Sequence, residues 1–181
     1  MGPLERSGLS RARRRLAGDV RGRVLELGAG TGRLFAAYAS PPLAAIDIDG
    51  AALRRARLRD PRVALVQADA EALPFKGGSF DATVSSLCLC SVPRPAVALS
   101  EARRVLKPGG ELRLLEHVRP PGPILGRLFD GFTPLWSRLS GGCQLNRRTA
   151  ELVGPAGFAT SSARFFLRGS VCQLRALKES E

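Results

Sequence analysis

A chain of 181 residues is long enough for one domain with a sizeable core and too short for two domains of ordinary size. Hydrophobic residues make up 44% of it and charged residues 24%, values that are ordinary for globular proteins and exclude disordered and collagen-like chains. No apolar run approaches the roughly 18 residues that span a bilayer. Residues 1–22 also lack the apolar centre of a secretion signal.

The chain is strongly basic, with 28 Lys and Arg against 16 Asp and Glu, a net charge of +12. Such a charge predicts attraction to polyanions, either nucleic acid or an anionic membrane surface. Residues 1–22 hold many arginines and few apolar side chains, so we expect a basic N-terminal segment that forms a solvated or frayed helix rather than a binding arm. We expect residues 23–181 to form a single domain.

The four cysteines, Cys88, Cys90, Cys143 and Cys172, contain no CxxC pair, and the chain has one histidine. This pattern does not match the usual spacing of zinc ligands, so we expect no metal, reduced thiols and a cytoplasmic setting. Cys88 and Cys90 would face opposite ways in an extended segment, which favours packing over catalysis.

Short apolar segments alternate with helical patterns from Val24 onward. Successive strands of this kind, joined by helices, favour a parallel sheet with right-handed crossovers. The pattern therefore predicts a doubly wound α/β fold with helices on both faces. The predicted strands are Val24–Leu27, Leu43–Ile46, Val63–Val66, Ala82–Val84 and Leu112–Leu115, and the predicted helices are Gly32–Ala39, Ala51–Leu58 and Ala96–Leu106, the last ended by a turn at Lys107–Gly110.

The alternation stops after Leu115, where we predict an apolar helical insertion at about residues 120–146. Apolar side chains recur there at helical spacing from Ile124 to Leu139. This stripe has two predicted roles, as a roof over an acceptor pocket that could also lie on a membrane, or as a face buried completely against the sheet. A short helix at Asn146–Val153 and a hairpin of Phe158–Leu167 with Val171–Leu177 complete the chain.

The strongest local motif runs from Val24 to Gly32, an apolar strand followed by glycines at alternate positions. A dinucleotide-binding loop would have glycine where Arg33 stands, so this loop suits a ligand without a pyrophosphate. Asp47, at the end of the second strand, is placed to accept both hydroxyls of a ribose. Asp69, at the end of the third, could accept an adenine amino group. Together these residues predict an adenosine-containing ligand.

With Leu73-Pro74-Phe75, Ser79-Phe80-Asp81 and Glu101–Gly110, these residues resemble the class I S-adenosylmethionine-dependent methyltransferases over roughly Val24–Leu115. Within that superfamily the chain is similar to the ubiquinone and menaquinone methyltransferases. More specifically, Leu87–Val92, Glu116-His117-Val118 and Gly142–Arg147 resemble the membrane-associated thiol S-methyltransferases and their bacterial relatives. Their N-terminal hydrophobic anchor has no counterpart in residues 1–22.

The resemblance implies a Rossmann-like, doubly wound sheet of seven strands whose last strand runs antiparallel. It also implies S-adenosylmethionine as the cofactor and S-adenosylhomocysteine as the product. The alternative role of Glu26 and Asp81 is to accept hydrogen bonds from N–H groups of nearby loops. Asp49 is expected to cap the following helix. The residues implied to contact the cofactor are Glu26, Gly28, Gly30, Gly32, Asp47, Ile48, Asp69, Ala70, Ser86 and Leu87.

His117 follows the fifth predicted strand, where an acceptor would approach. An imidazole titrates near neutral pH, so His117 is the candidate general base or acceptor contact, with packing against the apolar helix as its alternative. Phe132 and Trp136 are the candidates for the acceptor pocket.

The leading hypothesis is methyl transfer to a small apolar acceptor, a thiol, a lipid headgroup or a quinone-like ring. Peripheral contact with an anionic membrane would use Arg119, Arg127 and Arg138. One alternative is an RNA or other nucleic-acid methyltransferase, which the charge favours, although the N/D-P-P-Y/F/W motif of exocyclic-amine methyltransferases is missing. Another is a non-catalytic partner protein that binds the cofactor. No feature of the sequence indicates an oligomeric state.

Overall fold

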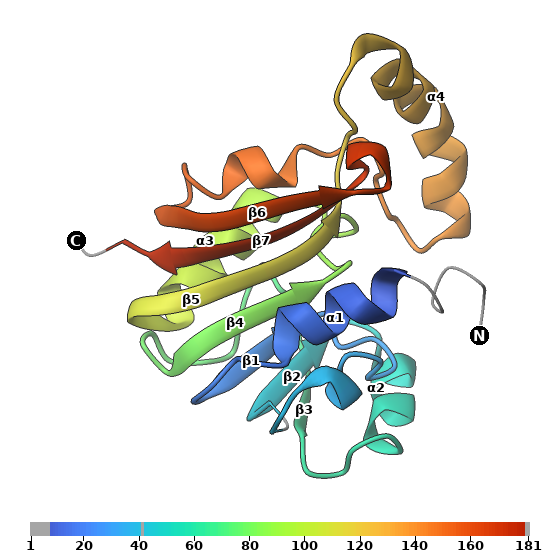
Figure 1. Ribbon diagram of the computed structural model, residues 1–181. Coiled ribbons are helices and arrows are strands. Elements are labelled where there is room, and N and C mark those ends of the chain that lie inside the picture. The colour runs from blue at the N-terminus through green and yellow to red at the C-terminus, as the bar shows by residue number, and fades with distance from the viewer. Residues whose placement is uncertain (1–7, 41, 180–181) are drawn as a thin grey trace.

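The computed structural model describes residues 8–40 and 42–179, which fold around one seven-stranded sheet (Figure 1). The strand order is β3-β2-β1-β4-β5-β7-β6; β1 to β5 pair in parallel, whereas β7 runs antiparallel to both of its neighbours. The predicted fold class, with its antiparallel last strand, is confirmed. The strands are β1 (Val24–Leu27), β2 (Ala44–Asp47), β3 (Ala64–Gln67), β4 (Phe80–Ser86), β5 (Leu106–His117), β6 (Phe158–Phe166) and β7 (Val171–Lys178).

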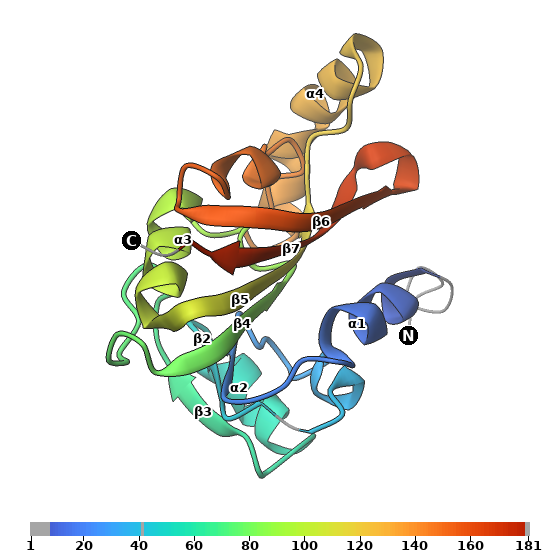
Figure 2. The same ribbon diagram turned by 60° about the vertical axis from the view of Figure 1, so that its left-hand side comes forward.

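Helices cover both faces of the sheet, as Figure 2 shows for α1 and α3. α1 and α2 pack on one face, and α3 with the short turn η3 packs on the other. Alternate residues of β1 enter the two layers, Val24 toward α1 and Leu25 and Leu27 toward α3, so every residue of this strand is buried. The helices are α1 (Ser10–Ala17), α2 (Gly50–Arg57), α3 (Pro95–Val105) and α4 (Pro123–Leu139), with 3-10 turns η2 (Phe35–Ala37), η3 (Thr149–Leu152) and η4 (Leu167–Gly169).

The described part of the basic N-terminal segment, from residue 8 onward, packs against the sheet. Residues 1–7 lie outside the described residues, but α1 docks on the sheet with Leu16 and Ala17 fully buried. Arg113 of β5 donates to the Leu16 carbonyl oxygen at 2.9 Å and forms an ion pair with Asp19. The expectation of a solvated or frayed helix is therefore wrong for α1, because a narrow apolar face among the arginines is enough to anchor it.

Two predicted helices shrink to single turns. The segment Gly32–Ala39 contains only η2, because Gly28, Gly30 and Gly32 all have positive φ and hold the chain in a loop. The segment Asn146–Val153 contains only η3. The predicted turn at Lys107–Gly110 lies inside β5, where pairing with β4 shifts register between Phe80 and Ala82.

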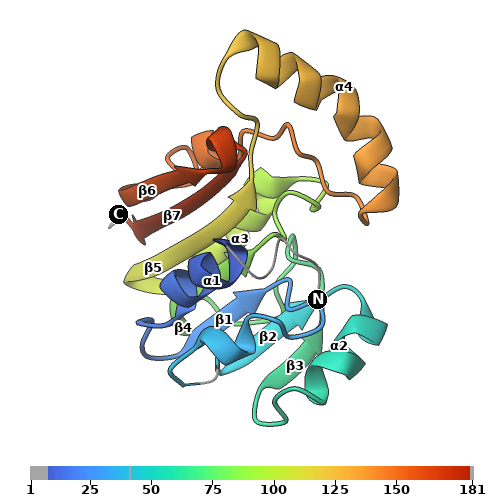
Figure 3. The same cartoon turned by 45° about the vertical axis from the view of Figure 1, so that its right-hand side comes forward.

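α4 stands at the edge of the molecule, away from the sheet (Figure 3). Its apolar stripe faces outward: Ile124 is 85% exposed, Leu128 65% and Leu139 77%. The prediction of complete burial against the sheet is therefore wrong. Among the helices of the described chain, none combines the length and apolarity needed to cross a membrane.

Candidate functional site

A cavity of about 530 Å³ lies at the carboxyl ends of β1, β2, β3 and β4. Ligands of open α/β sheets usually bind in this position, and the volume is that of a small-molecule site. All but one of the ten residues implied to contact the cofactor line it. The lining residues from that set are Glu26, Gly28, Gly30, Asp47, Ile48, Asp69, Ala70, Ser86 and Leu87.

Gly32 is the exception. A Cβ at this position would meet the Phe35 ring at 2.8 Å and the Cα of Ala56 at 3.2 Å. The glycine therefore lets the loop pack closely against η2 and α2, and the expectation that it lines the cofactor site is not met.

Gly30 faces open space. Its φ is +52°, a conformation that L residues rarely adopt, and a Cβ there would meet no atom of the described residues within 4 Å. Gly28, in contrast, lies against Cys88, whose Cβ and Sγ would collide with any side chain at that position. The loop thus combines a packed glycine with one that leaves room for a ligand.

Asp47 joins the end of β2 to the glycine loop. Its Oδ2 accepts the Gly30 N–H at 2.7 Å, and its Oδ1 accepts the Asp49 N–H at 2.9 Å. Each carboxylate oxygen keeps a second acceptor position, which can take a ribose hydroxyl. Asp49 caps α2 by accepting the N–H groups of Ala51 and Ala52 at 2.7 and 3.2 Å, as predicted.

Among the acidic residues that line the cavity, Glu26 has the most strongly shifted pKa. Its side chain is 2% exposed, and Oε2 has no hydrogen-bond partner among the described residues. Burial raises the pKa of Glu26 to about 8, against the opposing influence of the Tyr38 hydroxyl and the positive charge of Arg13. Glu26 belongs to the cavity lining, and the positive charge of an ammonium group bound there would favour its ionised form and give Oε2 a partner.

Asp81 has a purely local role. It accepts the Arg23 N–H at 2.7 Å and forms an ion pair with Lys107, and these contacts lower its pKa. Asp81 therefore accepts a hydrogen bond from a loop N–H group, the alternative role considered for Glu26 and Asp81. Glu26, in contrast, has an oxygen without a partner among the described residues that a ligand could use.

Replacing Glu26 with Gln should change how stability depends on pH. A carboxyl with a pKa near 8 when folded and an ordinary value of 4.5 when unfolded keeps its proton longer in the folded state. Between these values the folded protein therefore loses stability as pH rises, by about 1.4 kcal/mol per pH unit. Denaturant unfolding of both ligand-free proteins from about pH 5 to pH 8 should show the stability of Glu26→Gln relative to the wild type rising with pH. Parallel curves would contradict the raised pKa.

The end of β4 carries two unusual features at the cavity wall. Leu87 has a φ of +60°, and its N–H donates to the Leu115 carbonyl oxygen at 2.7 Å. Beside it, the buried Ser86 hydroxyl has no partner among the described residues. Strained backbone and unpaired buried polar atoms concentrate at ligand sites, which agrees with the position predicted for these two residues.

The structure places other residues differently from the prediction. Neither Phe132 nor Trp136 belongs to the cavity lining formed by the described residues. Phe132 lies on the outer side of α4, and Trp136 packs against Cys90, Cys143 and Leu145. Arg13 and Gly141 line the cavity from α1 and from the segment after α4, and no motif marks either of them in the sequence.

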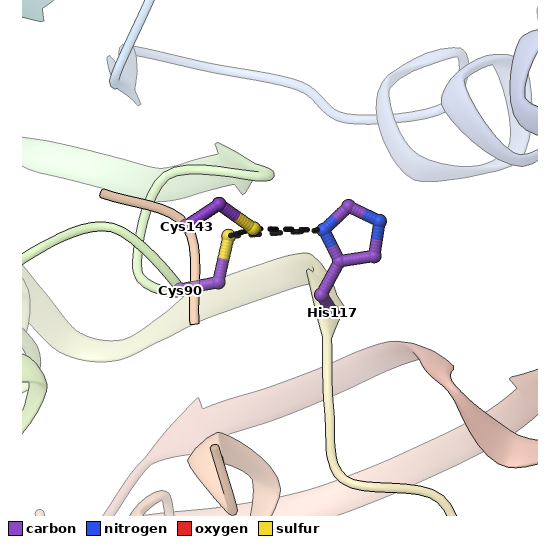
Figure 4. A group of neighbouring side chains, drawn as sticks. All are labelled: Cys90, His117 and Cys143. Carbon is purple, nitrogen blue, oxygen red and sulfur yellow. Dashed lines mark hydrogen bonds between the residues drawn. The ribbon is translucent and has the colours of Figure 1, made fainter. Parts of the chain in front are cut away.

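Cys90, Cys143 and His117 meet beside the cavity, in what we call the thiol cluster (Figure 4). The two Sγ atoms are 3.4 Å apart, and His117 Nδ1 lies 3.3 Å from Cys143 Sγ and 4.0 Å from Cys90 Sγ. Their shared hydrogen bond lowers the pKa of Cys143 and raises that of Cys90. The fold thus brings together side chains of the kinds that bind metal ions, although they are far apart in the sequence.

Glu116 fixes the backbone of this cluster. Its buried carboxylate accepts the N–H groups of Cys88, Leu89 and Cys90 at 3.1 to 3.2 Å and the Ser85 hydroxyl at 2.7 Å. Burial raises the pKa of Glu116, although these donors oppose the shift. Because Glu116 directly precedes His117, it ties the loop after β4 to the end of β5.

Comparison with known proteins matches residues 25–114 to a family described as a methyltransferase domain. Similar relatives include a demethylmenaquinone methyltransferase from Clavibacter sepedonicus, 41% identical over 132 residues that cover 70% of this chain and 53% of the relative. The ubiquinone/menaquinone biosynthesis C-methyltransferase UbiE from Azotobacter vinelandii is 38% identical over 138 residues, with 70% and 54% covered. The chain spans about half the length of these relatives.

Solved structures share the fold. An S-adenosylmethionine-dependent methyltransferase from Mesorhizobium loti aligns with a TM-score of 0.70 and 22% identity, covering 94% of this chain and all of the other. The [4+2]-cyclase SpnF aligns with a TM-score of 0.75 and 20% identity, covering 96% of this chain and 80% of the other. At these identities the similarity shows the fold alone. The two solved structures are named for different activities, a methyltransferase and a cyclase.

Proposed function

Because the chain belongs to the class I S-adenosylmethionine-dependent methyltransferases, in the branch of the ubiquinone and menaquinone enzymes, we propose that it methylates a small apolar acceptor. The observation that carries the proposal is the unpartnered Glu26 Oε2 in a cavity that Asp47 also lines. An ammonium group and a ribose are both present in S-adenosylmethionine, and these two carboxylates suit them.

The remaining lining residues fit the same cofactor. Gly30 leaves space for it, and Ile48, which is 70% exposed, offers an apolar surface beside Asp47 for the adenine ring. Asp69 and Ala70 would border the adenine, and Ser86 and Leu87 the reacting end. S-adenosylmethionine supplies a methyl group on a positively charged sulfur, so the protein has mainly to align donor and acceptor and exclude water.

The acceptor is proposed to be a quinone-like ring, with a thiol or a lipid headgroup as the other members of the same apolar class. The relatives named as quinone methyltransferases favour the ring. Leu87, Val92 and Pro93 give the cavity an apolar wall where such a molecule could rest. His117 directs Nδ1 to the thiols, so a role as general base would fall to its Nε2.

Product formation tests the proposal. The protein is incubated with S-adenosylmethionine and, separately, a reduced naphthoquinone or an alkyl thiol, and S-adenosylhomocysteine is quantified by mass spectrometry. We expect acceptor-dependent formation of S-adenosylhomocysteine, and its absence with Gly30→Val. Cofactor binding without product from any acceptor would instead favour the non-catalytic partner protein.

α4 is the proposed contact with an anionic membrane. Its exposed stripe is flanked by exposed Arg127 and Arg138, the arrangement of a helix that lies in a membrane interface. Arg119 does not contribute as expected, because it forms an ion pair with Asp130 at 2.8 Å. The net charge of +12 adds attraction to anionic lipid. The stripe consists of Ile124, Leu128, Phe132, Leu135 and Leu139.

Replacing Leu128 and Phe132 together with Ser should weaken sedimentation with vesicles of phosphatidylcholine and phosphatidylglycerol. Full burial of such a side chain contributes roughly 1.5–3 kcal/mol, and about half of that is at stake at each position because Leu128 is 65% and Phe132 45% exposed, so about tenfold weaker binding or more is expected. Leu58→Ser is the matched control, because Leu58 is 86% exposed on the distant α2 cap. Equal sedimentation of the double variant and the control would contradict insertion of α4.

A further inference from the structure

We propose that Cys90, Cys143 and His117 form a zinc site with two thiolate ligands, one imidazole ligand and one open position. Their ligand atoms all lie within 4.8 Å of one another (Figure 4). The metal-free expectation rested on ligand spacing along the chain, and the fold removes that objection by joining the end of β5 to two loops. This proposal replaces it.

The distances match a tetrahedral ion. With Zn–S bonds of about 2.3 Å and Zn–N bonds of about 2.0 Å, a tetrahedral site holds its two sulfurs about 3.8 Å apart and each sulfur about 3.5 Å from the nitrogen. The corresponding distances in the thiol cluster are 3.4 Å between sulfurs, and 3.3 and 4.0 Å from Nδ1. Each of these three distances lies within about 0.5 Å of the ideal value, so small shifts of the ligand atoms would bring them to the zinc geometry.

The backbone around the ligands is already fixed. Glu116 holds the Cys90 amide at 3.1 Å and is adjacent to His117 in the chain. The Gln144 N–H donates to the Cys90 carbonyl oxygen at 2.8 Å, which ties the Cys143 loop to the Cys90 loop. His117 itself pairs with Val171 in the ladder between β5 and β7. The backbone at Cys90 and His117, and directly after Cys143, is thus held by contacts that do not use the ligand atoms, which favours a preorganised metal site.

The surroundings favour a soft ion. Cys90 and Cys143 are buried, and Leu145, Trp136 and Phe129 pack around them. Two sulfurs and one imidazole select zinc over the oxygen-seeking ions magnesium and calcium. Three protein ligands with a fourth position open are typical of a zinc ion that binds an exogenous ligand, whereas structural zinc sites have four protein ligands.

The proposed zinc site adjoins the cavity. Ser91, next to Cys90, and Gly141, two residues before Cys143, both line the cavity. The fourth ligand would be water or a thiol from a molecule that enters there. The assignment of that ligand as a methyl acceptor rests on the proposed function, but the metal site itself does not.

Cobalt and zinc binding test the site directly in the full chain, reduced and handled without oxygen. We expect one Co²⁺ per chain, with the d–d bands of tetrahedral cobalt and a thiolate-to-cobalt charge-transfer band, and displacement of Co²⁺ by one equivalent of Zn²⁺. Cys90→Ser, Cys143→Ser and His117→Gln should each bind about 100-fold more weakly or worse. Cys172→Ala removes a buried thiol outside the cluster and should bind as the wild type does.

Circular dichroism and Tm, recorded for each metal-free variant, separate loss of a ligand from loss of the fold. The proposal is overturned if the folded wild type binds Co²⁺ no better than Cys143→Ser, or if Cys172→Ala loses the charge-transfer band as the cluster variants do. It is also overturned if the anaerobic protein contains a Cys90–Cys143 disulfide and takes up metal only weakly after reduction. Calorimetry with S-adenosylhomocysteine on the same samples reads the proposed function separately, since a failed metal site leaves cofactor binding intact.

Discussion

Replacing Gly30 with Val should reduce affinity for S-adenosylhomocysteine by on the order of 100-fold or more, equivalent to roughly 2.7 kcal/mol of binding free energy. At Gly30 a new side chain enters open space within the cavity, where a ligand would lie, and meets none of the described atoms. The loss should therefore concern binding much more than folding. Isothermal titration calorimetry measures it.

The control for this change is Gly78→Val. Gly78 has a φ of +67° and open space around its Cβ position, but it does not line the cavity formed by the described residues. Both variants carry the same kind of backbone strain, about 1–2 kcal/mol for an L residue in this region. Only Gly30→Val should lose the ligand. Similar affinities for the two variants would show that the glycine loop does not contact it.

Asp47→Ala should weaken S-adenosylhomocysteine binding by about 1.5–3 kcal/mol, the range for hydrogen bonds to a charged group. The change removes the proposed ribose acceptor and the contact with the Gly30 N–H at 2.7 Å, which helps to shape the glycine loop. Asp47→Asn keeps one amide oxygen as an acceptor and should lose less. Calorimetry at fixed salt concentration provides the three affinities.

A second ligand separates the two contributions of Asp47. Adenosine and 2′-deoxyadenosine differ by one ribose hydroxyl, so the wild type should prefer adenosine. In Asp47→Ala that preference should disappear, because the acceptor for the hydroxyl is gone. If the variant kept the full preference, Asp47 would act only through the loop, and the ribose would lie elsewhere.

The central strands of the sheet were predictable from their apolar sequences. Strands buried on both faces are rich in apolar residues, and β1, which is apolar except for Glu26, matches its predicted bounds at both ends. The lengths of the helices were harder to predict. The positive φ of Gly32 prevents the helix predicted from that residue onward. This conformation goes with close packing of the loop on Phe35 and on Ala56 of α2, and the contact with α2 depends on the tertiary structure.

The cavity was largely predictable, since its residues follow strand ends that meet at one edge of the sheet. Arg13 was not, because the docking of α1 depends on tertiary contacts such as that between Arg113 and the Leu16 carbonyl oxygen. The thiol cluster could not be predicted from the sequence for the same reason. Cys90, His117 and Cys143 are separated by 26 or more residues, and no local spacing records that the end of β5 and two loops converge.

A thermal-shift comparison of S-adenosylmethionine, S-adenosylhomocysteine, NAD and ATP tests the identity of the cofactor most directly. A ligand that binds only the folded protein raises Tm, and the rise increases with the logarithm of the ratio of ligand concentration to Kd. We expect both S-adenosyl compounds to raise the Tm of the wild type, with no comparable shift for Gly30→Val, and NAD and ATP to have little effect on either protein. A larger shift with NAD or ATP than with S-adenosylhomocysteine would contradict the assignment of this cavity to S-adenosylmethionine.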